Sequence, residues 1–265
     1  MNRFKYYLIA IWYGYKSKIV YRLSAWLGSI AGVATFLIQI IVWKTLLGSG
    51  EQFDTTFETM LTYLVITQLA TGFVQSFSGN TVNQLIYSGD ISVFLVRPLN
   101  LKTHIFLDGF GKNLFNVFLL NLPVCLVLFV FFEFYLPQSI LVVFISLLML
   151  INGVIMIFHY RYILGMVSFW LIKNPFTSWG FQNAEAIFSG KVLPIWLSPV
   201  WLATITQFLP FRYFTYEAVS LFVGKSSIDQ AWKSLLIQVF WVFLFILIEK
   251  KVSSCAMKKL VVQGG

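Results

Sequence analysis

The chain has 265 residues, of which 58% are hydrophobic and only 11% are charged, and its mean hydropathy is +0.80. A soluble domain carries about 25% charged residues, so this composition excludes an ordinary soluble protein and indicates a multi-spanning membrane protein. A transmembrane helix needs about 20 mostly apolar residues, and the length therefore allows about six spans. The net charge of +9 comes from basic residues beside apolar runs, which predicts membrane topology and argues against a nucleic-acid partner.

Residues 1–22 are aromatic and basic, and Phe4, Leu8 and Trp12 follow helical spacing. This pattern predicts a helix lying in the cytoplasmic interface, or else the charged flank of the first span. The apolar runs that follow predict six spans and their loops. The first two spans are expected at about 23–47 and 57–77, and the third from the region of Lys102–Lys112 to Phe132. The fourth is expected at about 139–158 and is followed by a short inner loop at 159–162. The fifth is expected to open at 163, and the last to lie at about 232–248.

Residues 83–99, between the second and third spans, form a short amphipathic segment. Leu85, Ile86, Ile91, Phe94 and Leu95 can gather on one side of a helix that is broken near Gly89. Asp90 can cap the second piece, and Arg97 and Pro98 end it, because proline has no N–H to continue a helix. The segment is too short to cross a bilayer, so it either contacts a soluble partner protein or is an interfacial helix without a partner.

The fifth span is strongly apolar only as far as Ile172 and then becomes polar. The residues that need explaining are Lys173, Gln182 and Glu185, because such side chains usually face a bundle interior, a subunit interface or water. We expect them to line a substrate path or a subunit seam, or else Lys173 to reach an interface and Glu185 to lie in outer water. Pro175 is expected to bend the helix between Lys173 and Glu185.

Residues 190–224 are apolar but are interrupted by Gly190, Pro194, Pro199 and Pro210, so they cannot form one straight span. We expect short re-entrant or interfacial helices on the outer side. For Arg212 and Glu217 the sequence slightly favours an interfacial arginine and a glutamate in outer water over a substrate path.

The distribution of Lys and Arg supports this topology. Most of them fall on segments assigned to the inside, Arg161 among them. Those assigned to the outside are Lys191, Arg212, Lys225 and Lys233. Excess positive charge inside predicts that both termini are cytoplasmic.

Motifs for catalysis are missing from the sequence. GKSS at 224–227 looks like the end of a phosphate-binding loop, but the required glycine five positions earlier is Val219. There is no nucleophile motif, zinc motif or calcium loop, and Cys125 and Cys255 are placed too far apart in the predicted topology to pair. We therefore expect no enzyme and no cofactor in this chain.

Several motifs, each weak alone, occur in a specific order along nearly the whole chain. They are Tyr21-Arg22, Trp43, YLVITQL at 63–69, SGDISVFLVRPL at 88–99, VSFW at 167–170, Gly190, Pro194, Ser198-Pro199, Trp201-Leu202, LPFRY at 209–213, Tyr216 and Leu221 to Gly224. In this order the chain resembles a permease subunit of the ABC-2 transporter family, in the branch of small six-span prokaryotic permeases often encoded in pairs. Ala218 departs from the pattern, because the family often has proline there.

The resemblance implies an all-α integral membrane fold in one transmembrane domain, 1–265, of a prokaryotic plasma membrane. It implies six transmembrane helices, an elbow helix at 1–22, a cytoplasmic coupling helix at 83–99 and outer re-entrant helices at 190–224. The partners implied are membrane lipid, a second permease chain, identical or paralogous, and two ABC ATPase subunits that hold ATP and Mg. The implied function is ATP-driven export of an amphipathic or hydrophobic substrate such as a drug, lipid or peptide.

The resemblance also implies roles for particular residues. Contacts with the ATPase are expected at Gly89, Asp90, Phe94, Leu95, Arg97 and Pro98. The outer region is expected to depend on Pro194, Pro199, Pro210, Arg212 and Tyr213. Two alternatives from other classes stay open: a secondary transporter driven by an ion gradient, and a membrane scaffold or sensor that moves nothing.

Overall fold

The computed structural model describes residues 3–20, 22–49, 54–91, 100–137, 139–167, 169–170 and 175–258, and within these ranges every regular element is a helix. In chain order the elements are α1 (Arg3–Val20), α2 (Arg22–Gly48), α3 (Phe57–Gly72), α4 (Gly79–Tyr87), α6 (Leu101–Phe115), η1 (Asn116–Asn121), α7 (Leu122–Phe131), α8 (Ile140–Val167), α9 (Pro175–Phe188), η2 (Ile195–Leu197), α10 (Val200–Gln207), η3 (Pro210–Phe214), α11 (Tyr216–Phe222) and α12 (Ile228–Lys258).

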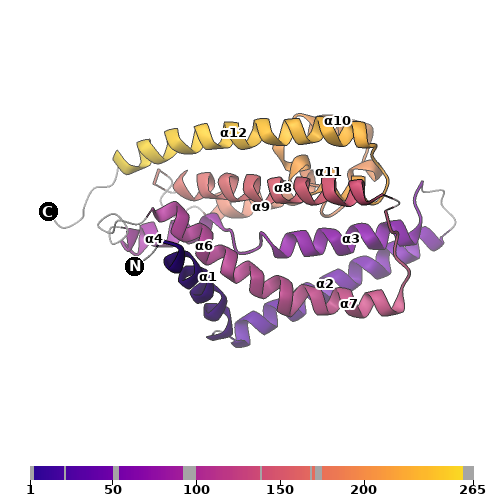
Figure 1. Cartoon of the computed structure of the whole chain (residues 1–265), viewed down its shortest axis with the longest axis horizontal. Helices are drawn as coiled ribbons and strands as arrows, with labels where there is room; N and C mark the ends of the chain where they lie inside the picture. The colour runs from indigo at the N-terminus through magenta and orange to yellow at the C-terminus, as the bar shows by residue number, and fades with distance from the viewer. Residues whose placement is uncertain are drawn as a thin grey trace.

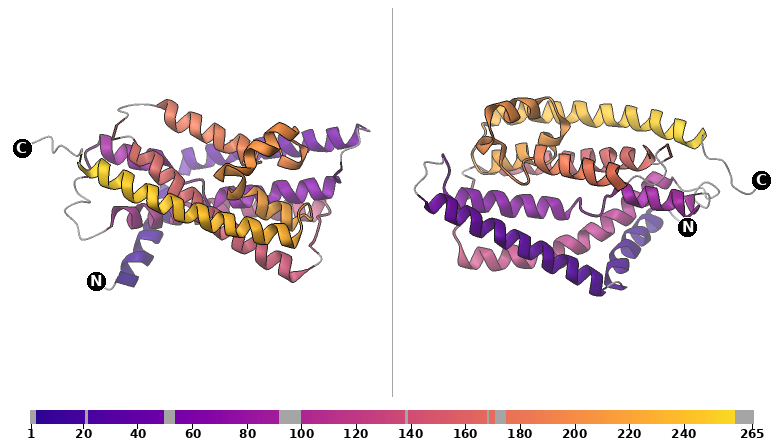
Figure 2. Two further views of the ribbon diagram at one scale, coloured as in Figure 1. Left: turned by 90° about the horizontal axis from the view of Figure 1, so that it is seen from above. Right: turned by 180° about the vertical axis from the view of Figure 1, so that it is seen from behind.

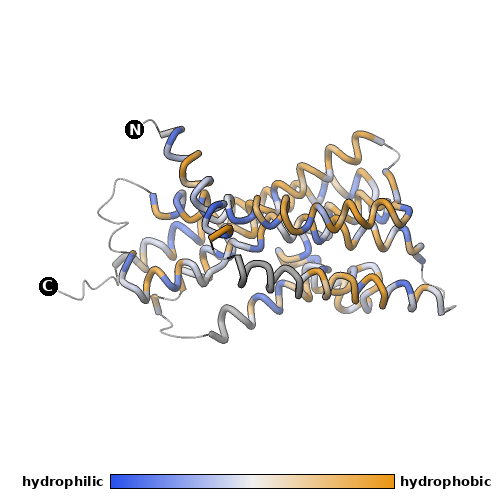
Figure 3. The backbone as a smooth tube through the Cα atoms, turned by 90° about the horizontal axis from the view of Figure 1, so that it is seen from below, coloured by the Kyte–Doolittle hydropathy of each residue, from blue (hydrophilic) through white to orange (hydrophobic). Residues whose placement is uncertain are grey.

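Three helices in the described part are long and apolar enough to cross a membrane. They are Leu101–Phe131, which joins α6, η1 and α7, then Ile140–Val167 of α8, and Ile228–Ala256 of α12. The described part of α2 adds a shorter apolar helix, Gly32–Gly48. Hydrophobic residues dominate the tube of these long helices in Figure 3. An all-helical fold with several apolar helices, as expected from the sequence, is therefore confirmed.

The long helices run along one common axis, which gives the bundle two distinct ends (Figure 1). The "α4 end" carries α4, the beginning of α6 and the C-terminal turns of α12. The "α10 end" carries α10, α11 and the connection from α7 to α8. The right-hand view in Figure 2 shows α10 and α12 along one side of the bundle and α2 along the opposite side.

Helix α1 falls within the range expected for the N-terminal helix, and it packs against α6. The contact is close because both helices have glycine there: a Cβ on Gly14 would lie 2.2 Å from the carbonyl oxygen of Asp108, and one on Gly111 would lie 2.0 Å from that of Ile11. Small residues at a helix crossing let the two backbones approach in this way. Burial at this crossing, and secondarily the charge of Lys112, lowers the pKa of the Lys18 ammonium. The opposite face of α1 exposes large apolar side chains such as Phe4 and Trp12.

The expected inner loop at 159–162 is wrong, because these residues lie inside the continuous helix α8. The sequence has no glycine or proline there that would end a helix. The polar side chains that suggested a loop find partners within the bundle, His159 on Glu249 and Arg161 on Glu185. A fifth span that opens at Ile163 is therefore wrong as well, because α8 continues to Val167.

The expected bend at Pro175 stays a prediction, because Lys173 and the other residues at 171–174 lie outside the described part of the chain. Pro175 is the first described residue of α9, the helix that carries Glu185.

Residues 190–224 form short helices, as expected, and not one span. Pro194 precedes η2, Pro199 precedes α10, and Pro210 is the first residue of η3. Each proline thus starts a new short helix, which is the position where a residue without an N–H does no harm. Gly190 opens the region with a φ of +74°, and its carbonyl oxygen accepts a hydrogen bond of 2.7 Å from the hydroxyl of Tyr63.

The GKSS residues at 224–227 form the turn between α11 and α12. Gly224 has a φ of +74°, and its N–H and that of Lys225 donate to carbonyl oxygens of α11, at Leu221 and Ser220. Ser227 and Gln230 then exchange hydrogen bonds between side chain and backbone, 3.1 Å and 3.3 Å long, which is the capping box that starts a helix. These residues therefore end one helix and begin the next.

Candidate substrate cavity and buried charges

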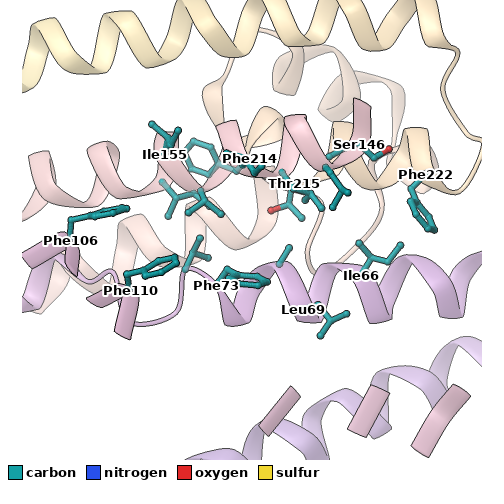
Figure 4. Close-up of a pocket in the computed structure, with 18 residues that line it drawn as sticks. Ile66, Leu69, Phe73, Phe106, Phe110, Ser146, Ile155, Phe214, Thr215 and Phe222 are labelled. Atoms are coloured by element: carbon teal, nitrogen blue, oxygen red, sulfur yellow. The ribbon is translucent and has the colours of Figure 1, made fainter. Parts of the chain in front are cut away.

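An apolar cavity of about 620 Å³ lies between α3, α6, α8 and the segment from η3 to α11 (Figure 4). We call it the apolar cavity. Its aromatic lining comes from four elements or their flanking residues and consists of Phe73, Phe106, Phe110, Phe214 and Phe222. Among the described residues that line it none is charged, and the only polar ones are Ser146 and Thr215. Pockets of this size are typical of sites for drug-sized ligands.

The spacing of side chains along α6 and α8 explains the walls of the apolar cavity. Phe106 and Phe110 are one helical turn apart and therefore share a face of α6. On α8, Leu147, Leu150 and Ile151 form a stripe with the same helical spacing. The small residues Ala70 and Ala218 leave the space open.

One edge of the apolar cavity reaches the outer surface of the bundle. Leu147 and Ile151 both line the cavity, yet their side chains are largely exposed. Because a membrane protein is surrounded by lipid at such apolar surfaces, an apolar molecule can reach the cavity laterally without passing a charged side chain of its described lining.

A buried ion triad links α8, α9 and the residues that follow α9. Glu185 is 2% exposed, and its carboxylate accepts hydrogen bonds from Arg161 at 2.7 Å and 3.1 Å and from Lys191 at 2.8 Å. The remaining arm of Arg161 donates to the carbonyl oxygens of Val74 and Phe77, at 2.7 Å and 2.8 Å. Arg161 therefore joins α9 to the connection between α3 and α4. The buried carboxylate is compensated by two cations and by good hydrogen-bond geometry.

The ion triad corrects two expectations from the sequence. Glu185 does not lie in outer water, because it is buried against Arg161 and Lys191. The topology assigned Arg161 to the inside and Lys191 to the outside, but both contact the same carboxylate, so their placement on opposite sides of the membrane is wrong. Charge counting failed here because it treats every cation as solvated, whereas these two neutralise a buried partner.

A second cluster of charges lies at the α4 end of the bundle. Glu249 on α12 is 2.8 Å from the ammonium of Lys102 on α6 and 2.5 Å from Nδ1 of His159 on α8. Its carboxylate is buried, while the side chain of Lys102 is 30% exposed. The three helices are thus tied together where α6 begins, immediately after residues 92–99.

The α10 end has its own buried polar contacts. Arg212 donates to Glu217, and Ser234 on α12 donates to the other oxygen of that carboxylate at 2.9 Å. Gln238 is fully buried and donates to the carbonyl oxygens of Met149 and Tyr213, at 3.0 Å and 2.8 Å. The slight preference for Glu217 in outer water is therefore wrong, because it is buried and paired with Arg212. These bonds fix the short helices of residues 190–224 to α8 and α12.

The structure describes two of the six expected coupling residues. Gly89 has a φ of +76° and ends the turn after α4, which confirms the expected break of the helix there. Asp90 accepts a hydrogen bond of 2.7 Å from the hydroxyl of Ser88, and Ile91 packs into the core. Phe94, Leu95, Arg97 and Pro98 lie outside the described residues, as does Lys173.

The remaining predicted residues are distributed as follows. Gln182 is exposed on α9, Glu185 is in the ion triad, and neither lines the apolar cavity. Tyr213 is buried, and its hydroxyl donates to the carbonyl oxygen of Gln207 at 3.0 Å.

Sequence reasoning missed Arg161, Lys102 and Glu249 as members of buried clusters, because each stands beside residues typical of a loop or a membrane edge.

The chain matches the family described as "ABC-2 family transporter protein" over residues 30–264. The match covers most of the chain and confirms the resemblance seen in the order of its motifs. No curated protein and no solved structure matches the chain significantly.

Proposed function

Because this chain belongs to the ABC-2 transporter family, a multi-pass membrane family, we propose that it is the permease subunit of an ATP-driven exporter for an amphipathic or hydrophobic substrate. It works with two ABC ATPase subunits, which hold ATP and Mg, and with a second permease chain, identical or paralogous. The observation that carries the substrate class is the apolar cavity, which has no charge in its described lining and reaches the outer surface of the bundle at one edge.

We propose six membrane crossings, by α2, α3, the α6–η1–α7 helix, α8, α9 with the residues after it, and α12. The α4 end then faces the cytoplasm of a prokaryotic cell, with α1 as the elbow helix and both termini on that side. This orientation is supported by the basic residues of α1 and by the position of α4 and the C-terminal end of α12 at one end of the bundle (Figure 1). The α10 end faces outward.

The proposed coupling path begins at residues 83–99, which contact the ATPase. Helix α4 packs closely on α8: a Cβ on Gly79 would lie 3.1 Å from the backbone nitrogen of Gly165. The connection before α4 is bound by Arg161, and Val74 in that connection also lines the apolar cavity. A displacement of α4 caused by the ATPase can therefore reach the cavity wall through contacts that are already formed.

The experiment that tests this function compares Gly89→Val with Gly48→Val in the complex with its ATPase. Among the described residues no atom lies within 4 Å of a Cβ at either position, but Gly89 has a positive φ, whereas Gly48 is the last residue of α2. Spin labels at Gln75 and Leu148 report ATP-driven changes in distance without requiring a known substrate.

We expect Gly89→Val to keep membrane insertion and ATP hydrolysis but to reduce the ATP-dependent shift in the distance distribution by about fivefold or more. Gly48→Val is expected to behave as wild type. An unchanged response in Gly89→Val would show that coupling does not pass through this turn. Loss of insertion and assembly would make the segment purely structural.

A further inference from the structure

A second pocket of about 400 Å³ adjoins the apolar cavity and differs from it in chemistry. Its lining includes Asn100, Lys102, Thr103 and His159, so we call it the polar pocket. Two residues, Phe106 and Ile155, line both the polar pocket and the apolar cavity. The two spaces therefore meet at these side chains, with cationic and hydrogen-bonding groups on one side and aromatic and aliphatic groups on the other.

Lys102 supplies the positive charge of the polar pocket. Its ammonium has three N–H groups, and Glu249 accepts from it at 2.8 Å. Nδ1 of His159 lies 2.5 Å from the same carboxylate and 3.4 Å from the Lys102 ammonium. With Glu249 and His159 as its partners among the described residues, the ammonium keeps one N–H group for a ligand. Glu249 does not line the pocket, so the ligand faces the cation and not its counter-ion.

The start of α6 adds to this preference for an anion. Asn100 is the N-cap of α6, and its side-chain oxygen accepts from the N–H of Lys102 at 3.0 Å. Asn100, Lys102 and Thr103 line the pocket at the end of the helix where the macrodipole favours negative charge. Lys102 and the helix end therefore act on the same small volume.

The polar pocket and the apolar cavity together have the length required for a long chain. From His159 in the polar pocket to Leu147 in the apolar cavity, α8 rises about 18 Å. Along this length the described lining of the apolar cavity is uncharged, as an alkyl chain requires.

We propose that the polar pocket and the apolar cavity form one binding site for a single-chain acidic amphiphile. Its carboxylate or phosphate head binds Lys102, and its chain passes Phe106 and Ile155 into the apolar cavity. This inference rests on the proposed function in that the bound amphiphile represents the class of substrate that the exporter moves. The amphiphile enters from the membrane at the exposed edge near Leu147 and Ile151.

The test uses the full chain in phosphatidylcholine nanodiscs and a palmitic acid that carries a photoreactive diazirine in its chain. Labelled peptides are located by mass spectrometry, and unlabelled compounds compete for the site. We expect labelling of the peptides that contain Phe106, Phe110 and Ile155. Palmitic acid and hexadecyl phosphate should both compete, because each joins an anionic head to a long apolar chain. Hexadecanol should compete about tenfold less well, because it lacks the charge that pairs with Lys102.

Inorganic phosphate separates recognition of the whole amphiphile from recognition of its head alone. We expect no competition from it at concentrations where hexadecyl phosphate competes. Competition by inorganic phosphate would overturn the proposal in favour of a simple anion site. Equal competition by hexadecanol would overturn it in favour of a neutral apolar site.

Two variants test the two parts of the site, each with a matched control. Ile155→Trp places a large side chain where the two spaces meet and should abolish labelling, whereas Leu148→Trp, on the same helix but outside the cavity lining, should not. Lys102→Gln should weaken labelling by about tenfold or more, whereas Lys112→Gln, which loses only its pair with Asp108, should not. Lys102→Arg should restore labelling.

Lys102→Gln loses its pair with Glu249 and for that reason can fail to fold. In that case Ile155→Trp still tests the site, because this variant leaves the pair intact. Labelling that persists in Ile155→Trp, or that falls equally in Leu148→Trp, would contradict the proposal. The binding experiment needs no ATPase. A chain that co-purifies with an ATPase but takes up no acidic amphiphile would therefore overturn this inference and leave the proposed function standing.

Discussion

Replacing Glu185 with alanine is expected to lower the free energy of unfolding by about 3–5 kcal/mol. Removal of the carboxylate leaves Arg161 and Lys191 as two neighbouring cations inside the bundle, and the side chain of each is only 14% exposed. Each would have lost its counter-ion without regaining water. The measurement is thermal unfolding of the purified chain in mild detergent, followed by its fluorescence.

The control for this prediction is Glu133→Ala, which removes the same side chain from an exposed position between α7 and α8. Surface substitutions of this kind usually change stability by less than about 0.5 kcal/mol. Glu185→Gln tests charge separately from volume and is expected to destabilise as well, because an amide cannot neutralise two cations. Equal unfolding temperatures for Glu185→Ala and Glu133→Ala would mean that the triad does not stabilise the fold.

Adding a single methyl group at Gly153 is expected to separate η3 from α8. A Cβ on Gly153 would lie 2.0 Å from the carbonyl oxygen of Phe214 and 2.9 Å from its carbonyl carbon, both of which are backbone atoms. Gly153→Ala should therefore destabilise the chain by about 1–3 kcal/mol or more, as overpacking of a core does. It should also weaken ligand binding, because Phe214 and Thr215 line the apolar cavity.

Gly32→Ala is the matched control, because no atom of the described residues lies within 4 Å of a Cβ on Gly32 of α2. Alanine is the better helix former, so this change should be neutral or stabilising by about 0.5–1 kcal/mol. Only Gly153→Ala is thus expected to lower the unfolding temperature. A stabilising effect of Gly153→Ala would show that η3 does not approach α8 as described.

Long apolar helices were well predicted because their signals are local. The end of α2 follows from a mostly apolar run that stops at Gly48, and the short helices of residues 190–224 follow from their prolines. The N-terminal helix was also expected from its spacing of aromatic residues. In each case the residues that determine the element lie within it or next to it.

Polar residues inside helices were misread because their partners are distant in the sequence. His159 pairs with Glu249, which is 90 positions away, and this contact makes a polar stretch compatible with the middle of a helix. Arg161 likewise binds carbonyl oxygens more than 80 positions earlier. Pairing partners of this kind depend on how the helices pack, which single-sequence periodicity does not report.

The apolar cavity could not be predicted for a related reason. Its lining combines Phe73, Phe106 and Phe214, three phenylalanines among the 28 in the chain. Nothing in the sequence distinguishes these three from phenylalanines that face lipid. Only the packing of α3, α6, α8 and η3 places them around one space (Figure 4).

The measurement that tests the central claim most directly is a mild-detergent pull-down of the tagged chain from its native membranes, with identification of the proteins that co-purify. We expect an ATPase with a phosphate-binding loop, together with a second permease chain, identical or paralogous. A stable complex without any ATPase would contradict the permease function and would favour a secondary transporter or a membrane scaffold.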